Sequence, residues 1–167
     1  RNFITHLNNL SKVTKMKISI IQLSDIHIKS NEDFIITHID EFCKSCKQYI
    51  NETSRVVVVI SGDIAFSGTA EQYDIAYNFL KNCEKFWKKE NKICNFDYVI
   101  VPGNHDCEFK DDAIREVLIK DVLQKGDVED NAIIEHCLHP QKNFWCFYKK
   151  LIDAQESSIS WLRELKI

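Results

Sequence analysis

Apolar residues along this chain form three short continuous runs. The runs are KISIIQLSD (residues 17–25), RVVVVISGD (55–63) and FDYVIVP (96–102), and they are rich in β-branched residues with almost no polar alternation. Runs of this length and composition are typical of strands covered on both faces in a parallel sheet. Each run therefore predicts a buried strand.

Helical periodicity fills the intervals between these runs. From Asp33 to Ile50, and again from Thr69 to Trp87, apolar residues recur at steps of three and four, as on the inner face of an amphipathic helix. Thr69 and Gln72 have the spacing of a capping box, in which each side chain bonds the backbone amide of the other residue. The order strand, helix, strand, helix, strand predicts an α/β fold with right-handed crossovers in a parallel sheet.

The later part of the chain is less regular. Helical spacing predicts a short helix around Ile114 and Val122, a helix over residues 143–152 and another over 157–167. The stretch IIEHCLHP leaves two interpretations open, a surface loop or a strand that ends in the metal ligands His136 and His139. Neither a repeat nor a linker divides the chain, so residues 1–167 are expected to form a single domain.

Composition narrows the class of protein. The chain is 44% hydrophobic and 28% charged with a net charge of −3, which is ordinary for a globular domain and counts modestly against a nucleic-acid binder. Apolar runs fall short of the roughly 18–20 residues that cross a bilayer, so we expect a cytoplasmic protein without a membrane partner. An odd number of cysteines, seven, favours small buried side chains in a reducing compartment, chiefly Cys43, Cys46, Cys83 and Cys146.

Each predicted strand ends in a short polar motif: SDIH, SGD and GNHD. The carboxyl ends of parallel strands share one edge of a sheet, so the motifs should converge there. Oxygen and imidazole donors of this kind suit Zn, Mn or Fe. On an extended backbone, residues two apart point the same way and can bind one ion together. The candidate site residues are Asp25, His27, Asp63, Asn104, His105 and Asp106.

The motifs DxH, GD and GNHD, in this order after apolar strands, resemble the calcineurin-like metallophosphoesterase family. The flanking segments LSDIHIKS and ISGDIAFSGTAEQY resemble its phosphohydrolase and phosphodiesterase branch. The resemblance implies an αββα sandwich, of which this chain would supply the amino-terminal βαβαβ half of the catalytic domain. It also implies two divalent metal ions (Mn, Fe or Zn) bridged by a hydroxide.

The resemblance also assigns roles by position. Asp25 and His27 would bind the first ion, Asp63 would bridge both ions, and Asn104 would bind the second. His105 would face the phosphate of the substrate as a general acid or charge stabiliser, oriented by Asp106.

The implied function is a metal-dependent phosphoesterase that hydrolyses phosphodiester or phosphomonoester bonds. Two alternatives stay open: a nuclease of the same family, acting on nucleotides or nucleic acid, and a non-catalytic binding module that retains a half-site. The family's later histidines, including a GHxH pair, are missing from this sequence. They are expected beyond Ile167, unless His136 and His139 replace them.

Overall fold

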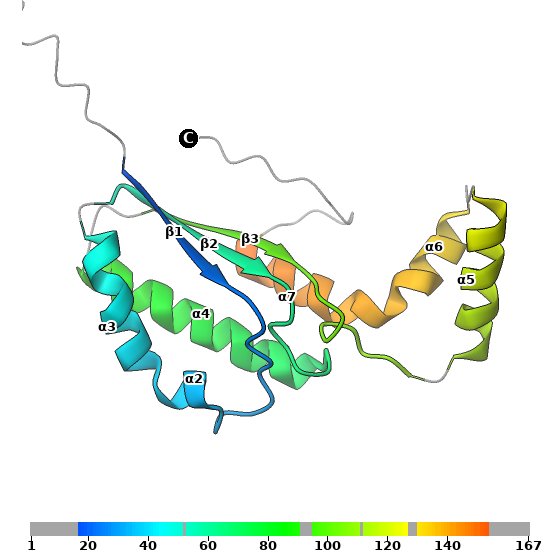
Figure 1. Ribbon diagram of the computed structural model, residues 1–167, viewed down its shortest axis with the longest axis horizontal. Helices are drawn as coiled ribbons and strands as arrows, with labels where there is room; N and C mark the ends of the chain where they lie inside the picture. The colour runs from blue at the N-terminus through cyan, green and yellow to red at the C-terminus, as the bar shows by residue number, and fades with distance from the viewer. Residues whose placement is uncertain (1–16, 52, 91–94, 111, 127–129, 154–167) are drawn as a thin grey trace, which may run out of the picture.

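The computed structural model describes residues 17–51, 53–90, 95–110, 112–126 and 130–153 (Figure 1). The predicted order of strands and helices is confirmed. The predicted helix at 157–167 lies outside the described residues. The elements are β1 (Ile18–Leu23), α2 (Phe34–Thr37), α3 (Ile39–Ile50), β2 (Arg55–Ser61), α4 (Ala70–Glu90), β3 (Asn95–Val101), α5 (Ala113–Lys125), α6 (Asn131–Leu138), the 3-10 helix η1 (His139–Gln141) and α7 (Lys142–Ile152).

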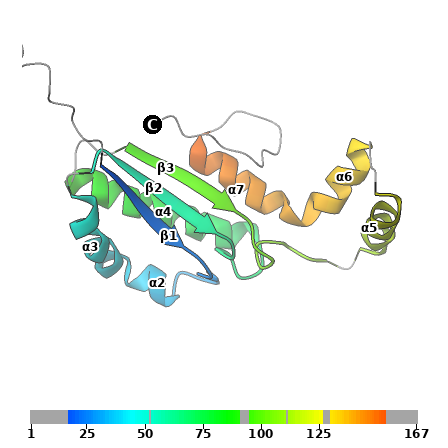
Figure 2. The ribbon, with the colours of Figure 1, turned by 45° about the horizontal axis from the view of Figure 1, so that its top comes forward.

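The three strands form a parallel sheet in the order β1-β2-β3. Ile20 pairs with Val57, which pairs with Asp97, so the strands run in step and end near one another. The connections place α3 and α4 on the same face of the sheet, where α7 joins them (Figure 2). The predicted α/β class with a βαβαβ core is confirmed.

The core lies between this face and the helices. Val56, Val58 and Ile60 of β2 are 0–2% exposed and belong to one buried cluster with residues of α3, α4 and α7. The indole nitrogen of Trp87 on α4 donates to the backbone oxygen of Cys43 on α3 at 3.0 Å, which ties the two helices together. Among the cysteines predicted to be buried, Cys43 and Cys83 are buried, Cys46 is half-buried and Cys146 is exposed.

The opposite face of the sheet carries no helix among the described residues (Figure 2). Ile20 is 70% exposed there. Arg55 and Asp97 form an ion pair at 3.3 Å on the same face. The apolar composition of β2 predicted cover on both faces, and helices of the described part cover one.

The predicted helix from Asp33 to Ile50 is interrupted at His38, which separates α2 from α3. His38 has φ −112° and ψ 29°, and its Nδ1 lies 3.0 Å from the carbonyl oxygen of Phe34. The hydroxyl of Thr37 donates to the same oxygen at 3.1 Å. Side chains that bond nearby carbonyls compete with the helical hydrogen bonds, which explains the break.

One of the two hydrogen bonds predicted for the capping box at α4 is confirmed. The hydroxyl of Thr69 accepts from the amide of Gln72 at 3.4 Å, as predicted. The Gln72 side chain, however, accepts from the amide of Ser67 at 2.9 Å. It therefore fixes the loop two residues before the cap.

The apolar face predicted around Ile114 and Val122 exists as α5 but is not buried in the core. Ile114 and Val117 are 66% and 65% exposed, and α5 packs beside α6, away from the sheet (Figure 1). None of the helices in the described ranges combines the length and the apolar composition needed to cross a bilayer.

We expect Ile60→Ala to lower the free energy of unfolding by about 2–5 kcal/mol, because the side chain is fully buried and its removal leaves a cavity. Ile20→Ala is the matched control, because it removes the same atoms from a 70% exposed position on the neighbouring strand. Its effect should stay within about 0.5 kcal/mol. Urea unfolding followed by tryptophan fluorescence compares the two variants, and equal losses would contradict the one-sided core.

Candidate metal centre

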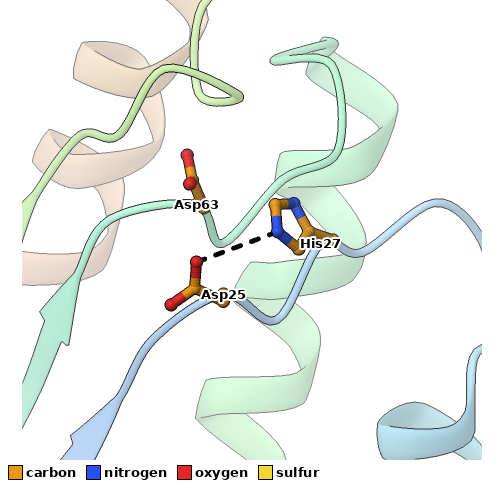
Figure 3. A group of neighbouring side chains, drawn as sticks. All are labelled: Asp25, His27 and Asp63. Atoms are coloured by element: carbon orange, nitrogen blue, oxygen red, sulfur yellow. Dashed lines mark ion pairs between the residues drawn. The ribbon is translucent and has the colours of Figure 1, made fainter.

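Three of the predicted ligands converge at the carboxyl end of the sheet. Asp25 and His27 follow β1, Asp63 follows β2, and each offers a ligand atom within 4.8 Å of the others. Nε2 of His27 lies 4.0 Å from Oδ1 of Asp25 and faces it (Figure 3). Asp25 is exposed, whereas the other two are half-buried. The group is therefore open to solvent on one side.

Backbone hydrogen bonds hold the loops after β1 and β2 side by side. The amide of His27 donates to the carbonyl of Asp63 at 3.0 Å, and the amide of Ile28 donates to that of Ile64 at 2.9 Å. The two loops thus continue the parallel pairing of their strands beyond the sheet. This pairing brings ligands from distant parts of the chain together.

All three ligands have left-handed backbone conformations, with φ 54° at Asp25, 52° at His27 and 55° at Asp63. Such angles are uncommon for residues with a Cβ and cost roughly 1–2 kcal/mol each. Alternate residues of an extended strand point the same way, which was the expected reason for Asp25 and His27 to converge. That reason is wrong, since both residues lie in the loop after β1 with left-handed backbone.

Two glycines allow the loops after β2 and β3 to approach each other. Gly62 has φ 101°, which confirms the sharp turn expected before Asp63. A Cβ at Gly103 would lie 2.1 Å from Oδ1 of Asp63, so only glycine fits there. The turn at Gly62 was predictable from the sequence, whereas the role of Gly103 depends on a contact between distant loops.

His105 lies at the edge of the group. Its amide donates to Oδ1 of Asp63 at 2.9 Å, and its ring centroid is 4.5 Å from that of His27. Its Nδ1 lies 2.8 Å from the carbonyl oxygen of Phe66. Because a carbonyl only accepts, we assign the proton to Nδ1, which leaves Nε2 for other partners.

The structure corrects the role expected for Asp106. Its side chain is 0% exposed, and its carboxylate bonds backbone amides rather than the His105 ring. The carboxylate accepts from the amides of Ala65 and Gly103, both at 2.9 Å, and from that of Ile64 at 3.4 Å. Phe66 orients His105 instead, while Asp106 joins the loops after β2 and β3.

Tyr73 on α4 adds a further bond to this junction, the contact that Asp106 makes between the loops after β2 and β3. Its hydroxyl donates to the backbone oxygen of Asp106 at 2.9 Å and lies 3.2 Å from the Asp106 carboxylate. Burial raises the pKa of the Tyr73 phenol, and the negative charge of Asp106 raises that pKa further. The phenol therefore stays a neutral donor.

The remaining candidates are Asn104 and the two later histidines, His136 and His139. Asn104 is exposed in the loop after β3, and its role as a ligand of a second ion stays a prediction. His136 lies in α6 and His139 in η1, so both interpretations of IIEHCLHP, loop and strand, are wrong. Nε2 of His136 pairs with Asp112 at 3.0 Å. Neither histidine belongs to the ligand group found among the described residues.

The donor set fits a divalent transition metal. Two carboxylates and an imidazole are ligands that Zn, Mn and Fe share, and three protein ligands leave positions for water or substrate, as catalytic sites do. Nδ1 of His27 is buried with no hydrogen-bond partner in the described part of the chain. Nε2 of the same ring faces Asp25 and is the nitrogen offered to the ligand group.

Taken together, the fold and site define an α/β protein with a candidate metal centre at the strand ends. A family model for calcineurin-like phosphoesterases matches residues 18–167. The chain therefore belongs to this family, as its motifs indicated.

One relative shares sequence with this chain over a shorter stretch. A protein of Arcobacter nitrofigilis, named probable glycerophosphodiester phosphodiesterase GpdQ, is 30% identical over 91 residues. The match covers 52% of this chain and 29% of the relative, so the chain spans less than a third of that protein's length.

We expect stability to fall above about pH 10 partly through Tyr73. There the phenol ionises in the unfolded chain but stays protonated in the fold, so the unfolded state binds fewer protons. The unfolding free energy then drops by about 1.4 kcal/mol per pH unit for each such group, whereas the contribution is fully present below pH 10.

Tyr73→Phe should remove that part of the slope in urea unfolding between about pH 10 and 11.5. Tyr49→Phe, at a residue 72% exposed, is the control and should keep the parent slope. An unchanged slope in Tyr73→Phe would show that the phenol is not buried against Asp106.

Proposed function

We propose that this chain carries part of the active site of a metal-dependent phosphoesterase. The observation that carries the proposal is the convergence of Asp25, His27 and Asp63 within 4.8 Å, in a member of the calcineurin-like phosphoesterase family. The substrate is a phosphodiester or a phosphomonoester, and no feature of the described residues favours nucleic acid over a smaller ester.

Two divalent ions, when bound, supply an activated water and offset the negative charge of the phosphoryl group. In this proposal Asp25 and His27 would hold the first ion, Asp63 would contribute to both, and Asn104 would hold the second. The amide of His105 donates to one carboxylate oxygen of Asp63, which fixes the carboxylate for that task. We propose manganese as the ion to test first and the cytoplasm as the compartment.

His105 acts on the substrate through Nε2. Its Nδ1 proton is committed to the Phe66 carbonyl at 2.8 Å, which holds the ring in place. In its charged form Nε2 donates to the leaving oxygen or to a phosphoryl oxygen. Asp106 contributes only by holding the loop that carries His105.

We expect Asp63→Asn in the full-length protein to weaken Mn²⁺ binding by at least about 100-fold, because the variant loses a carboxylate that lies within 4.8 Å of the other two ligand atoms. Calorimetric titration measures this loss. Asp74→Asn, at an aspartate 70% exposed on α4, is the matched control and should bind Mn²⁺ like the parent. Equal affinity in the Asp63 variant would refute the metal centre.

We expect His105→Asn to lower turnover of bis(p-nitrophenyl) phosphate by about 10² to 10⁴, because a proton donor or charge stabiliser is lost. Mn²⁺ affinity should change by only a few-fold, since the His105 amide and not its ring contacts Asp63. Turnover close to that of the parent would rule out the catalytic role, and a large loss of metal binding would instead make the ring a ligand.

A further inference from the structure

A cleft of about 700 Å³ opens beside the metal centre. His27 and His105 line it on the side of the ligand group, and Lys29, Phe34, Ile35 and Phe66 line it elsewhere. The cleft is therefore continuous with the site at which a phosphate would bind. Most of the wall away from the histidines is apolar, which the chemistry at a phosphoryl group does not require.

Phe34 is the most exposed apolar residue of this wall. Its side chain is 75% exposed, although an exposed phenylalanine ring contributes no burial energy to the stability of the fold. Its ring stacks on that of His38, with centroids 4.1 Å apart and planes at 21°. The stacking favours one orientation of the ring, and most of the side chain stays accessible to a ligand.

The backbone that carries Phe34 is held as well. The carboxylate of Asp33 accepts from the amides of Lys29 and Ser30, at 2.5 Å and 3.1 Å, and closes a tight turn directly before the ring. Because the turn holds the backbone and the stacking favours one ring orientation, a ligand that stacks on Phe34 has less ordering left to do.

Phe66 extends the aromatic wall to the metal centre. Its ring is 5.6 Å from that of His105 and is 41% exposed. Nζ of Lys29 lies 4.1 Å from its centroid, so a positive charge stands on the wall of the cleft. A ligand with an anionic head and an aromatic body matches this sequence of surfaces.

We propose that the cleft is a subsite for a planar aromatic substituent of the phosphate ester, with Phe34 as the stacking platform. This inference rests on the proposed phosphoesterase function. It makes Phe34 a specificity-determining residue. A small polar substituent, such as a glycerol group, would leave the rings of Phe34 and Phe66 in water and gain little from them.

The test compares phenylphosphonate with methylphosphonate, which share the anionic head and differ by the ring. Binding of each to the Mn²⁺-loaded full-length protein is measured by calorimetry, so that no turnover is needed. We expect phenylphosphonate to bind about tenfold more tightly, as one aromatic stacking contact allows.

Phe34→Ala should reduce this preference to about twofold or less, since the platform is lost. Phe34→Tyr keeps a ring and should retain the preference. Tyr49→Ala removes an aromatic residue of similar exposure, 72%, from outside the cleft and should also retain it.

The possible failures are distinguishable. If both phosphonates bind the parent protein equally, or if Phe34→Ala keeps the preference, the subsite is refuted and the phosphate site stands. If neither phosphonate binds in the presence of Mn²⁺, the proposed function fails and the subsite fails with it.

Discussion

The buried carboxylate of Asp106 is the interaction on which the site depends. It comes from the loop after β3 and accepts hydrogen bonds from backbone amides on both sides of the junction, at Gly103 and at Ala65 of the loop after β2. An unpaired carboxylate would be costly to bury, so these bonds and the Tyr73 hydroxyl are what make its position tolerable. Once the junction forms, the Asp63 carboxylate and the His105 amide are brought into contact.

The ligands themselves are held by the loops rather than by the sheet. Left-handed backbone at Asp25, His27 and Asp63 persists because the first two loops are bonded to each other beyond the strands. Gly103 permits the closest approach, because any side chain there would overlap the Asp63 carboxylate. The site is thus preorganised by contacts between backbone segments, which a metal ion can use without rearranging the fold.

Much of the fold was predictable because burial leaves a period in the sequence. The apolar runs predicted the strands β1, β2 and β3, and the spacing that became α4 records which face of that helix meets the core. The candidate ligands were predictable for a related reason, since parallel strand ends share an edge. Helix α5 shows the limit of this reasoning, because Ile114 and Val117 have helical spacing and are nevertheless exposed.

What could not be predicted depends on single bonds between distant residues. The tie from Phe66 to His105 joins a carbonyl to an imidazole, and a backbone carbonyl carries no sequence signal. The family resemblance assigned Asp106 to orient His105, yet the Asp106 carboxylate bonds the amide of Ala65 while the His105 ring bonds the Phe66 carbonyl. The secondary structure around His136 could not be predicted, because the eight residues of α6 are too few to show a helical period.

The most direct test of the account is the position of a bound ion. Crystals of the full-length protein loaded with Zn²⁺ would be measured at the zinc absorption edge, where the anomalous signal locates zinc without reference to the sequence. The account predicts a peak about 2.0–2.2 Å from a carboxylate oxygen of Asp25, from Nε2 of His27 and from a carboxylate oxygen of Asp63. A fully occupied peak elsewhere, with none between these three residues, would contradict it.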